Sequence, residues 1–273
     1  MHKPRIVIKI GSSNLCNGEM IDEGQINALA KLISEIKIRF DVILVSSGAV
    51  ASGYTRVQLD KSTLQNKQAL ASIGQPLLME SYRKAFAQFD IPTAQILLAG
   101  HDFDSRKSTA FARNTIDALL ANNALPIINE NDAIATSEII FGDNDRLSAH
   151  AAYYFGAELL AILSDIDGYF DKNPHTDSTA KLLSQVHTIP QNALNQSHTP
   201  HSSFATGGIV TKLMAADFLL QRHCMMFLSH GRKLDVLKNF LLHNTQDSGT
   251  LFCPADSKGL QELDTPNSLK QKA

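Results

Sequence analysis

The sequence has no excess of either charge and little cysteine. Its 25 Lys and Arg residues face 27 Asp and Glu residues, for a formal net charge of -2, and no basic run marks a nucleic-acid or membrane surface. Cys16, Cys224 and Cys253 are an odd number at long separations, which fits neither a disulfide framework nor the paired spacing of a zinc site. We therefore expect a protein of the reducing cytoplasm whose partners are small molecules.

Long apolar runs are also missing. The apolar stretch at residues 6–8 is interrupted by Lys9 and is too short for a signal peptide or a membrane span. The 273 residues are nevertheless 44% hydrophobic, enough to bury a substantial core. We expect one α/β domain over residues 1–254, followed by a polar, disordered tail over residues 255–273.

Short apolar strands alternate along the chain with longer segments that carry an apolar residue every third or fourth position. Near-continuous apolar strands separated by helices are typical of a parallel sheet covered on both faces. The pattern predicts a three-layer α/β/α sandwich with a mainly parallel central sheet. Strands are expected at residues 5–10, 41–45, 93–98, 125–128, 159–163 and 224–228, and helices around residues 26–36, 70–86, 108–121, 147–155, 209–221 and 236–241.

Two segments depart from this alternation. Residues 129–145 alternate apolar and polar side chains among Asn, Asp and Gly, which predicts a hairpin at the edge of the sheet. Residues 175–203 are polar and carry few strong apolar anchors, so we expect a mobile or partly ordered insertion that could act as a lid.

The end of the first strand is a candidate phosphate site. Lys9 is followed by Gly11 and then by a helical pattern, and a glycine turn at a helix N-terminus directs backbone N–H groups and a positive dipole toward an anion. Lys9 would add a full positive charge. The alternative is that Lys9 is a solvated lysine at a strand end.

A second glycine turn, Thr206-Gly207-Gly208, also opens a helix and has Lys212 one turn further on. Alone this turn would be an ordinary start of a helix. It becomes a candidate phosphate site because it is the second turn in the chain that combines glycine with a nearby lysine. The sequence does not have the spacing of a P-loop, the dinucleotide fingerprint or the motif set of protein kinases.

Polar residues gather after two of the predicted strands. Ser47 could bind a ligand carboxylate or simply cap the next helix. Residues 129–132 (Asn-Glu-Asn-Asp) and 142–145 (Gly-Asp-Asn-Asp) could position a polar substrate, although such residues are also common in turns. Neither they nor residues 165–168 have the spacing of an EF-hand, so we do not expect a calcium site.

Five motifs in register resemble the amino acid kinase superfamily, and within it most closely the glutamate 5-kinase family. They read VIKIGSS, VSSGA, INENDAIAT, FGDNDRLSA and ATGGIVTK, and the likeness runs from about residue 6 to residue 252. Many bacterial members continue into a C-terminal domain of the PUA type, and this sequence resembles the short form without that domain.

The resemblance implies roles for individual residues. Lys9, Asp145 and Lys212 match the catalytic positions, and Ser47, Asp132 and Asn144 match those that hold glutamate. The nucleotide positions are matched by Lys9, Gly11, Ser164, Asp165, Thr206, Gly207, Gly208 and Lys212. Ser164 and Ile209 replace a common Thr and a common Met, and residues after Asp165 diverge, which puts the purine contacts in doubt.

The resemblance also implies ATP as phosphoryl donor, Mg²⁺ as cofactor, L-glutamate as acceptor, and a first step of proline synthesis. It further implies a homodimer or homotetramer, functional coupling to glutamyl phosphate reductase, and inhibition by proline near Glu138. Rival hypotheses are another acceptor (aspartate, N-acetylglutamate, carbamate or a nucleoside monophosphate) and a catalytically silent sensor of glutamate or proline. A dinucleotide-dependent oxidoreductase is not expected, because the sequence lacks the glycine-rich fingerprint that binds a dinucleotide.

Overall fold

The computed structural model describes residues 3–17, 20–134, 144–174, 176–194, 208–257 and 259. Within them, eight strands form one sheet in the order β5-β6-β4-β1-β7-β9-β10-β8. The eight strands are β1 (Arg5–Ile10), β4 (Asp41–Ser46), β5 (Thr93–Leu98), β6 (Leu125–Glu130), β7 (Leu159–Ser164), β8 (Gln185–Val186), β9 (Met225–His230) and β10 (Thr250–Phe252). A small separate hairpin pairs β2 (Cys16–Asn17) with β3 (Met20–Ile21).

The main sheet is parallel from β5 to β9, and β10 is antiparallel to β9. Its central strand, β1, is buried along its whole length and lies between β4, the next strand of this sheet along the chain, and β7, which follows much later. The chain therefore extends from β1 in both directions across the sheet. The crevice at the carboxyl ends of strands around such a reversal is where open α/β sheets bind ligands.

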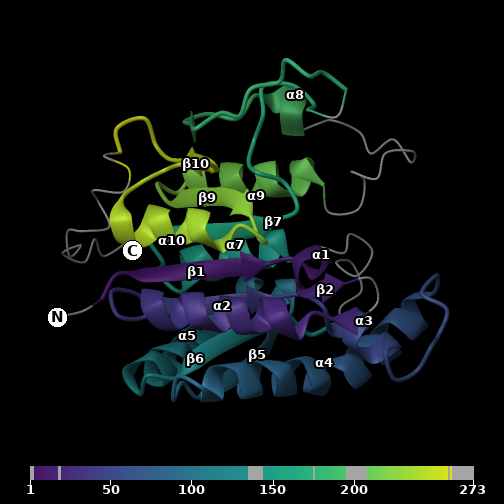
Figure 1. Ribbon diagram of the computed structural model, residues 1–273. Helices are drawn as coiled ribbons and strands as arrows, with labels where there is room; N and C mark the ends of the chain where they lie inside the picture. The colour runs from purple at the N-terminus through teal and green to yellow at the C-terminus, as the bar shows by residue number, and fades with distance from the viewer. Residues whose placement is uncertain are drawn as a thin grey trace.

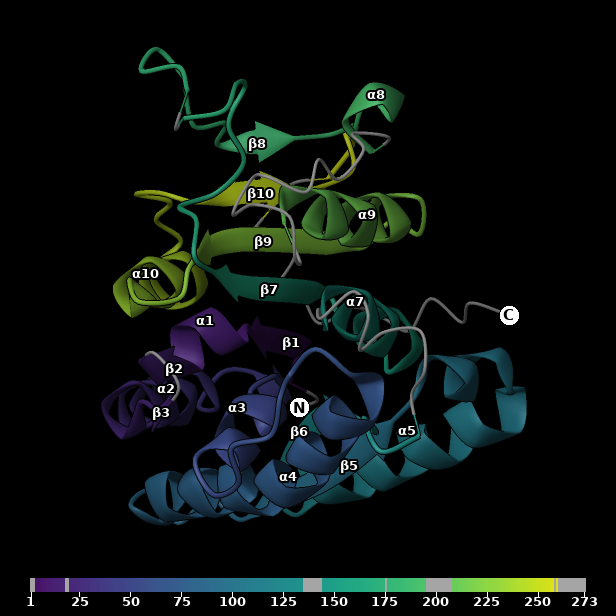
Figure 2. The ribbon, with the colours of Figure 1, turned by 90° about the vertical axis from the view of Figure 1, so that its right-hand side faces the viewer.

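Helices cover both faces of the sheet, and Figure 2 shows α10 and α2 on one side and α9, α7 and α5 on the other. The first face buries Ile6 and Ile8 of β1, and the second face buries Val7. The helices are α1 (Ser12–Leu15), α2 (Glu23–Ile36), α3 (Ala49–Tyr54), α4 (Leu64–Ala87), α5 (Arg106–Ala121), α7 (Asp145–Tyr154), α8 (Gln191–Leu194), α9 (Ile209–Leu220) and α10 (Leu234–His243), with a 3₁₀ helix η1 (Gly100–Asp104).

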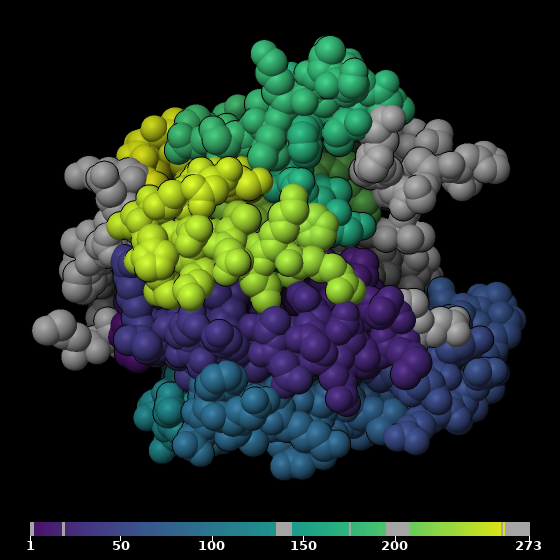
Figure 3. All heavy atoms as spheres, viewed as in Figure 1, coloured from purple at the N-terminus to yellow at the C-terminus, as the bar shows by residue number. Residues whose placement is uncertain are grey.

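The helices α10, α2 and α4 lie side by side in the view of Figure 1, and their side chains form the yellow, purple and blue bands on the surface in Figure 3. The sequence of α2 accounts for its place in this layer. Asp22 caps the helix by accepting from the Gln25 N–H at 3.0 Å, and the residues with helical spacing between Ile26 and Ile36 are buried against the sheet.

Two glycines allow α3 and α4 to touch backbone to backbone. A Cβ atom at Gly53 would lie 1.9 Å from the Leu70 carbonyl oxygen, and one at Gly74 would lie 1.8 Å from the Ala49 carbonyl oxygen. Gly48, before α3, has φ +104°, a conformation that favours glycine. These three glycines fix the position of the turn after β4, which contains Ser47.

The structure confirms the predicted sandwich and extends four of the predicted strands at their carboxyl ends, β4 and β7 by one residue each. β6 continues to Glu130 and β9 continues to His230, each two residues beyond the predicted end. Of the segment expected to be mobile or partly ordered, residues 176–194 are ordered: β8 pairs with β10, and Val186, Ile189 and Ala193 are buried in the core. Residues 195–203, most of the predicted hairpin (135–143, with Glu138) and nearly all of the predicted tail lie outside the described residues.

We predict that Gly74→Ala lowers the free energy of unfolding by about 1–3 kcal/mol, because the added methyl group must separate two packed helices. The measurement is urea unfolding followed by circular dichroism. Gly24→Ala is the matched control, since the new Cβ would meet only the Asp22 side chain at 3.2 Å. Equal stability of the Gly74 variant and the control would show that the helices can separate without cost.

Candidate active site

One buried carboxylate holds two lysines at the carboxyl end of the central strands. Lys9 Nζ lies 2.6 Å from Asp145 Oδ1, and Lys212 Nζ lies 3.1 Å from Asp145 Oδ2. The three residues are 3%, 0% and 5% exposed in the order Lys9, Asp145, Lys212. Counted on their own, these three side chains carry two positive charges and one negative charge in a nearly dry place, a combination that favours an incoming anion.

Three separate elements bring these side chains together. Lys9 is on the face of β1 that α7 and α9 cover, Asp145 is the first residue of α7, and Lys212 lies in the first turn of α9. Because α7 and α9 pack against each other, the start of each helix lies beside the end of β1. The sequence predicted all three residues, and the structure places them in direct contact.

Thr211 is a member of this cluster that the sequence did not single out. Its hydroxyl oxygen lies 2.9 Å from Asp145 Oδ2 and 2.9 Å from the Gly208 carbonyl oxygen. Asp145 Oδ2 therefore receives a hydroxyl and an ammonium group, while Oδ1 receives Lys9. Thr211 directly precedes Lys212 in α9, but the sequence does not show that its hydroxyl meets a carboxylate 66 residues away.

Asn144 is held by a chain of amides on the other side of Asp145. Its Nδ2 lies 2.6 Å from the Ser46 carbonyl oxygen, 3.2 Å from Ser47 Oγ and 2.8 Å from Asn129 Oδ1. Asn129 Oδ1 also accepts from the backbone N–H of Glu130 at 2.9 Å, which fixes the orientation of the Asn129 amide. Asn144 must therefore present nitrogen to these groups and turn its Oδ1 away from them.

The amide chain continues to α4. Asn129 Nδ2 donates to Gln75 Oε1 at 2.8 Å, and Gln75 Nε2 donates to Gln95 Oε1 of β5 at 3.0 Å. Asn129 and Gln75 are buried, so breaking this chain would leave polar groups without partners. The sequence predicted Ser47 and Asn144, and the structure joins them, but Gln75 was missed because nothing local marks a glutamine inside a helix.

Asp132 lies in the turn that follows β6, at the same edge of the sheet. Burial raises its pKa from an ordinary value to about 6. Among the described residues, no cation contacts its carboxylate, in contrast to Asp145. An acid of this kind is suited to bind a cationic group that arrives from outside, because the carboxylate lacks a compensating charge until then.

The predicted nucleotide residues lie at the ends of β1 and β7 and at the start of α9. Gly11 has φ −77°, and a Cβ there would lie 3.7 Å from Lys9 Nζ, so the fold itself does not require glycine. Ser164 Oγ donates to Asp165 Oδ1 at 2.9 Å. Gly208 is the N-cap of α9. Thr206 and Gly207 lie outside the described residues.

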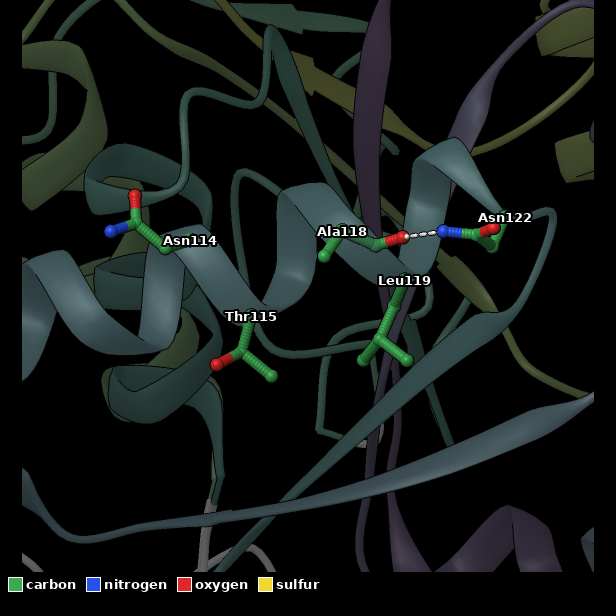
Figure 4. Close-up of a pocket in the computed structure, with 5 residues that line it drawn as sticks. All are labelled: Asn114, Thr115, Ala118, Leu119 and Asn122. Carbon is green, nitrogen blue, oxygen red and sulfur yellow. Dashed lines mark hydrogen bonds between the residues drawn. The ribbon is translucent and has the colours of Figure 1, made fainter.

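An open depression of about 510 Å³ lies elsewhere, on α5. Figure 4 shows that its lining comes from one helix, with Asn122 turned back to bond the Ala118 carbonyl oxygen at 2.8 Å. These residues form the C-terminal half of α5 and its C-cap, which lead to the amino end of β6, at the edge of the sheet opposite the lysines. With no ionisable side chain among Asn114, Thr115, Ala118, Leu119 and Asn122, it offers no phosphoryl-transfer chemistry.

Two further features of the described residues bear on function. No three His, Cys, Asp or Glu side chains among them are grouped as a metal site would require. No helix in the same part of the chain combines the length and the apolar character needed to cross a membrane.

Comparison with known proteins finds relatives over nearly the whole chain. The model of the amino acid kinase family matches residues 4–228. The glutamate 5-kinase of Helicobacter hepaticus is 73% identical over 263 residues, which are 96% of this chain and 100% of that protein. That of Wolinella succinogenes is 53% identical over 253 residues, covering 91% of this chain and 97% of that protein.

The chain belongs to the amino acid kinase family, among the glutamate 5-kinases. The resemblance expected from five motifs is thereby confirmed over nearly the whole sequence, and the chain is a kinase.

Solved structures of two other kinases share the fold. UMP kinase from Ureaplasma parvum superposes with a TM-score of 0.63 at 17% identity, over 93% of this chain and all of that one. Isopentenyl phosphate kinase from T. acidophilum superposes with a TM-score of 0.63 at 15% identity, over 91% of this chain and 99% of that one. At such identities the likeness establishes the fold class alone.

We predict that Thr211→Val lowers kcat about tenfold or more in this kinase, because Asp145 Oδ2 loses a hydroxyl donor and Lys212 can move. Thr211→Ser keeps the hydroxyl and should retain most of the wild-type rate. The measurement is steady-state kinetics, with thermal unfolding of both variants as the control for folding. A serine variant as slow as the valine variant would exclude a role for the hydroxyl.

Proposed function

We propose that the protein transfers the γ-phosphoryl group of ATP to the γ-carboxylate of L-glutamate, giving L-glutamyl 5-phosphate and ADP in a first step of proline synthesis. The observation that carries the proposal is the buried pair of lysines on Asp145, which stands beside a group of amide and acid side chains suited to an amino acid. The 73% identity to a glutamate 5-kinase supports the choice of acceptor.

The reaction needs no general base. A γ-carboxylate has a pKa near 4.3, so at neutral pH it is already the anion that attacks phosphorus. The new bond joins a carboxylate oxygen to the γ-phosphorus, and the bond that breaks is the one between that phosphorus and the oxygen bridging to the β-phosphate, whose electrons leave with ADP. The protein must therefore bring two anions together and stabilise the charge that spreads over the transferred group.

Lys9 and Lys212 are suited to that task, because both ammonium groups are fixed in advance by one carboxylate. Lys9 lies at the end of β1, where it would contact the transferred phosphoryl group. Lys212 and the N–H groups at the start of α9 would hold the remaining phosphates. Asp145 orients both lysines and keeps them apart from each other.

Mg²⁺ fits such a site only as a companion of the nucleotide. Both oxygens of Asp145 are engaged by Lys9, Lys212 and Thr211. Mg²⁺ is commonly held by substrate phosphates and one or two carboxylates, and the nucleotide would supply most of its ligands. When bound, it would supply further positive charge to the phosphates.

The acceptor would be held by Ser47, Asp132 and Asn144. Asn144 turns its amide oxygen away from the groups that its Nδ2 contacts, and Asp132 lacks a cation among the described residues, so both can accept from the α-ammonium group of glutamate. Ser47 Oγ is 3.2 Å from Asn144 Nδ2 and can bond a substrate carboxylate. This division puts the α-amino and α-carboxyl groups at one end of the site and the γ-carboxylate toward Lys9.

A screen of ATP turnover against several acceptors tests the proposal. We expect turnover with L-glutamate and much less with aspartate, N-acetylglutamate, carbamate or a nucleoside monophosphate. N-Acetylglutamate is the most informative of these, since it lacks the ammonium group that Asp132 would bind. Glutamate binding without any ATP consumption would instead favour the silent sensor, the second hypothesis from the sequence.

We predict that Lys9→Ala and Lys212→Ala each lower kcat on the order of a hundredfold or more while the protein stays folded. Each variant leaves Asp145 with the other lysine and with Thr211, so the carboxylate keeps a charged partner. Steady-state kinetics measures the loss of kcat, and circular dichroism shows whether each variant stays folded. Near-normal turnover in either variant would remove that lysine from the proposed mechanism.

We predict that KM for glutamate rises as the pH falls below about 6, because Asp132 then takes up a proton and loses its attraction for the ammonium group. Asp132→Asn should have a high KM that no longer changes over this range. The measurement is KM for glutamate between pH 5 and 8 in both proteins. If the Asn variant kept the wild-type pH dependence, another group would be responsible.

Further parts of the proposal follow from the family. We propose that the protein acts in the cytoplasm as a homodimer or homotetramer, that a glutamyl phosphate reductase consumes its acyl phosphate, and that proline inhibits it. We also propose residues 1–254 as the kinase domain. Measuring turnover with and without proline tests the proposed inhibition.

A further inference from the structure

We propose that His230 binds the nucleoside part of the nucleotide, a role that rests on the proposed function of this edge of the sheet. His230 is the last residue of β9, which continues two residues beyond the apolar run that marked the strand in the sequence. It is half-buried, and no described residue accepts a hydrogen bond from its Nε2. The inference rests on its position beside Ser164, on the face of the sheet that α9 covers.

The register of the sheet puts His230 next to Ser164. The two residues are Cα partners in the parallel pair of β7 and β9, so their backbones lie about 4.8 Å apart. Side chains alternate along a strand, and Leu228 of β9 and Ile162 of β7 both face the core under α7 and α9. His230 and Ser164 therefore lie on that same face, at the carboxyl ends of their strands.

The turn after His230 is held to the predicted nucleotide turn. The Gly231 N–H donates to the Ser164 carbonyl oxygen at 2.7 Å, and the Lys233 ammonium lies 2.7 Å from Asp167 Oδ1. A Cβ at Gly231 would lie 2.6 Å from the Asn14 side chain, so this position is closely packed. The end of β9 is thus built as part of the same surface as Ser164 and Asp165.

One bond fixes the hydrogen on the imidazole. The backbone N–H of Arg232 donates to His230 Nδ1 at 3.1 Å, and a ring nitrogen that accepts carries no hydrogen. The neutral ring then has its hydrogen on Nε2, at the far side from the backbone. His230 therefore presents one oriented donor, which suits a ribose hydroxyl or a ring nitrogen of a base.

The distance of β9 from Lys9 indicates that His230 would contact the nucleoside rather than the phosphates. Phosphoryl transfer is assigned to Lys9 on β1, and β9 is two strands away, on the order of 10 Å at the spacing of neighbouring strands. A group at that distance from the γ-phosphoryl position meets the opposite end of an extended nucleotide.

The substitution His230→Asn tests the role. An Asn side-chain oxygen can accept from the N–H two residues on, so the bond from Arg232 is kept while the Nε2 donor is lost. We expect Kd and KM for ATP to rise about three- to tenfold, the loss of one hydrogen bond. The KM for glutamate and the melting temperature should stay as in the wild type. His243→Asn, at an exposed position at the end of α10, is the matched control.

Inorganic tripolyphosphate separates the two ends of the nucleotide. As a competitor against ATP it should bind the His230 variant as well as it binds the wild type. Equal losses for tripolyphosphate and ATP, or unchanged ATP binding in the variant, would overturn the assignment. Lys212→Ala is measured in parallel: if it weakens ATP binding and His230→Asn does not, the inference fails and the proposed function stands. If neither the His230→Asn variant nor the Lys212→Ala variant bound ATP more weakly than the wild type, the inference and the proposed function would both be contradicted.

Discussion

The arrangement of the candidate site depends on the contact of the Asp145 carboxylate with Lys9 and Lys212. Removing three ionised groups from water costs more than a single buried ion pair usually returns, so such a cluster is weak evidence for stability. Counted on their own, the three side chains carry one positive charge in excess. A buried excess of positive charge becomes favourable when an anion arrives, a property that a phosphoryl-transfer site needs and an inert core does not.

The two halves of the site are positioned by different parts of the fold. The lysines and Asp145 depend on the packing of α7 against α9 over one face of the sheet. The amide chain reaches the site from the other face, through Gln75 of α4 and Asn129 of β6. Asn144 and Asp145 are neighbours in the chain, and each belongs to one of these halves. A shift of the turn before α7 would therefore disturb the amide chain and the two lysines together.

The sequence predicted the layers of the fold because buried parallel strands and their helices have distinct apolar patterns. It also predicted the lysines and Asp145, since glycine turns and motif spacing are local signals. It could not predict Gln75 or Thr211, whose roles come from contacts 54 and 66 residues away along the chain.

Other errors have the same origin. Residues 176–194 looked like an insertion because β8 is only two residues long and its pairing partner, β10, follows much later. β9 seemed to end at Leu228 because Ser229 and His230 are polar, although the backbone continues its pairing with β7. Side-chain polarity predicted the end of the apolar core correctly and the end of the strand incorrectly.

We infer that Asp145 acts by placing the lysines rather than through chemistry of its own. The most direct measurement is kcat for Asp145→Asn, for Lys212→Ala and for the double variant, each checked for folding. Groups that act as one unit give losses that do not multiply, so the double variant should be about as slow as the slower single variant. A double variant whose loss equals the product of the two single losses would contradict the account.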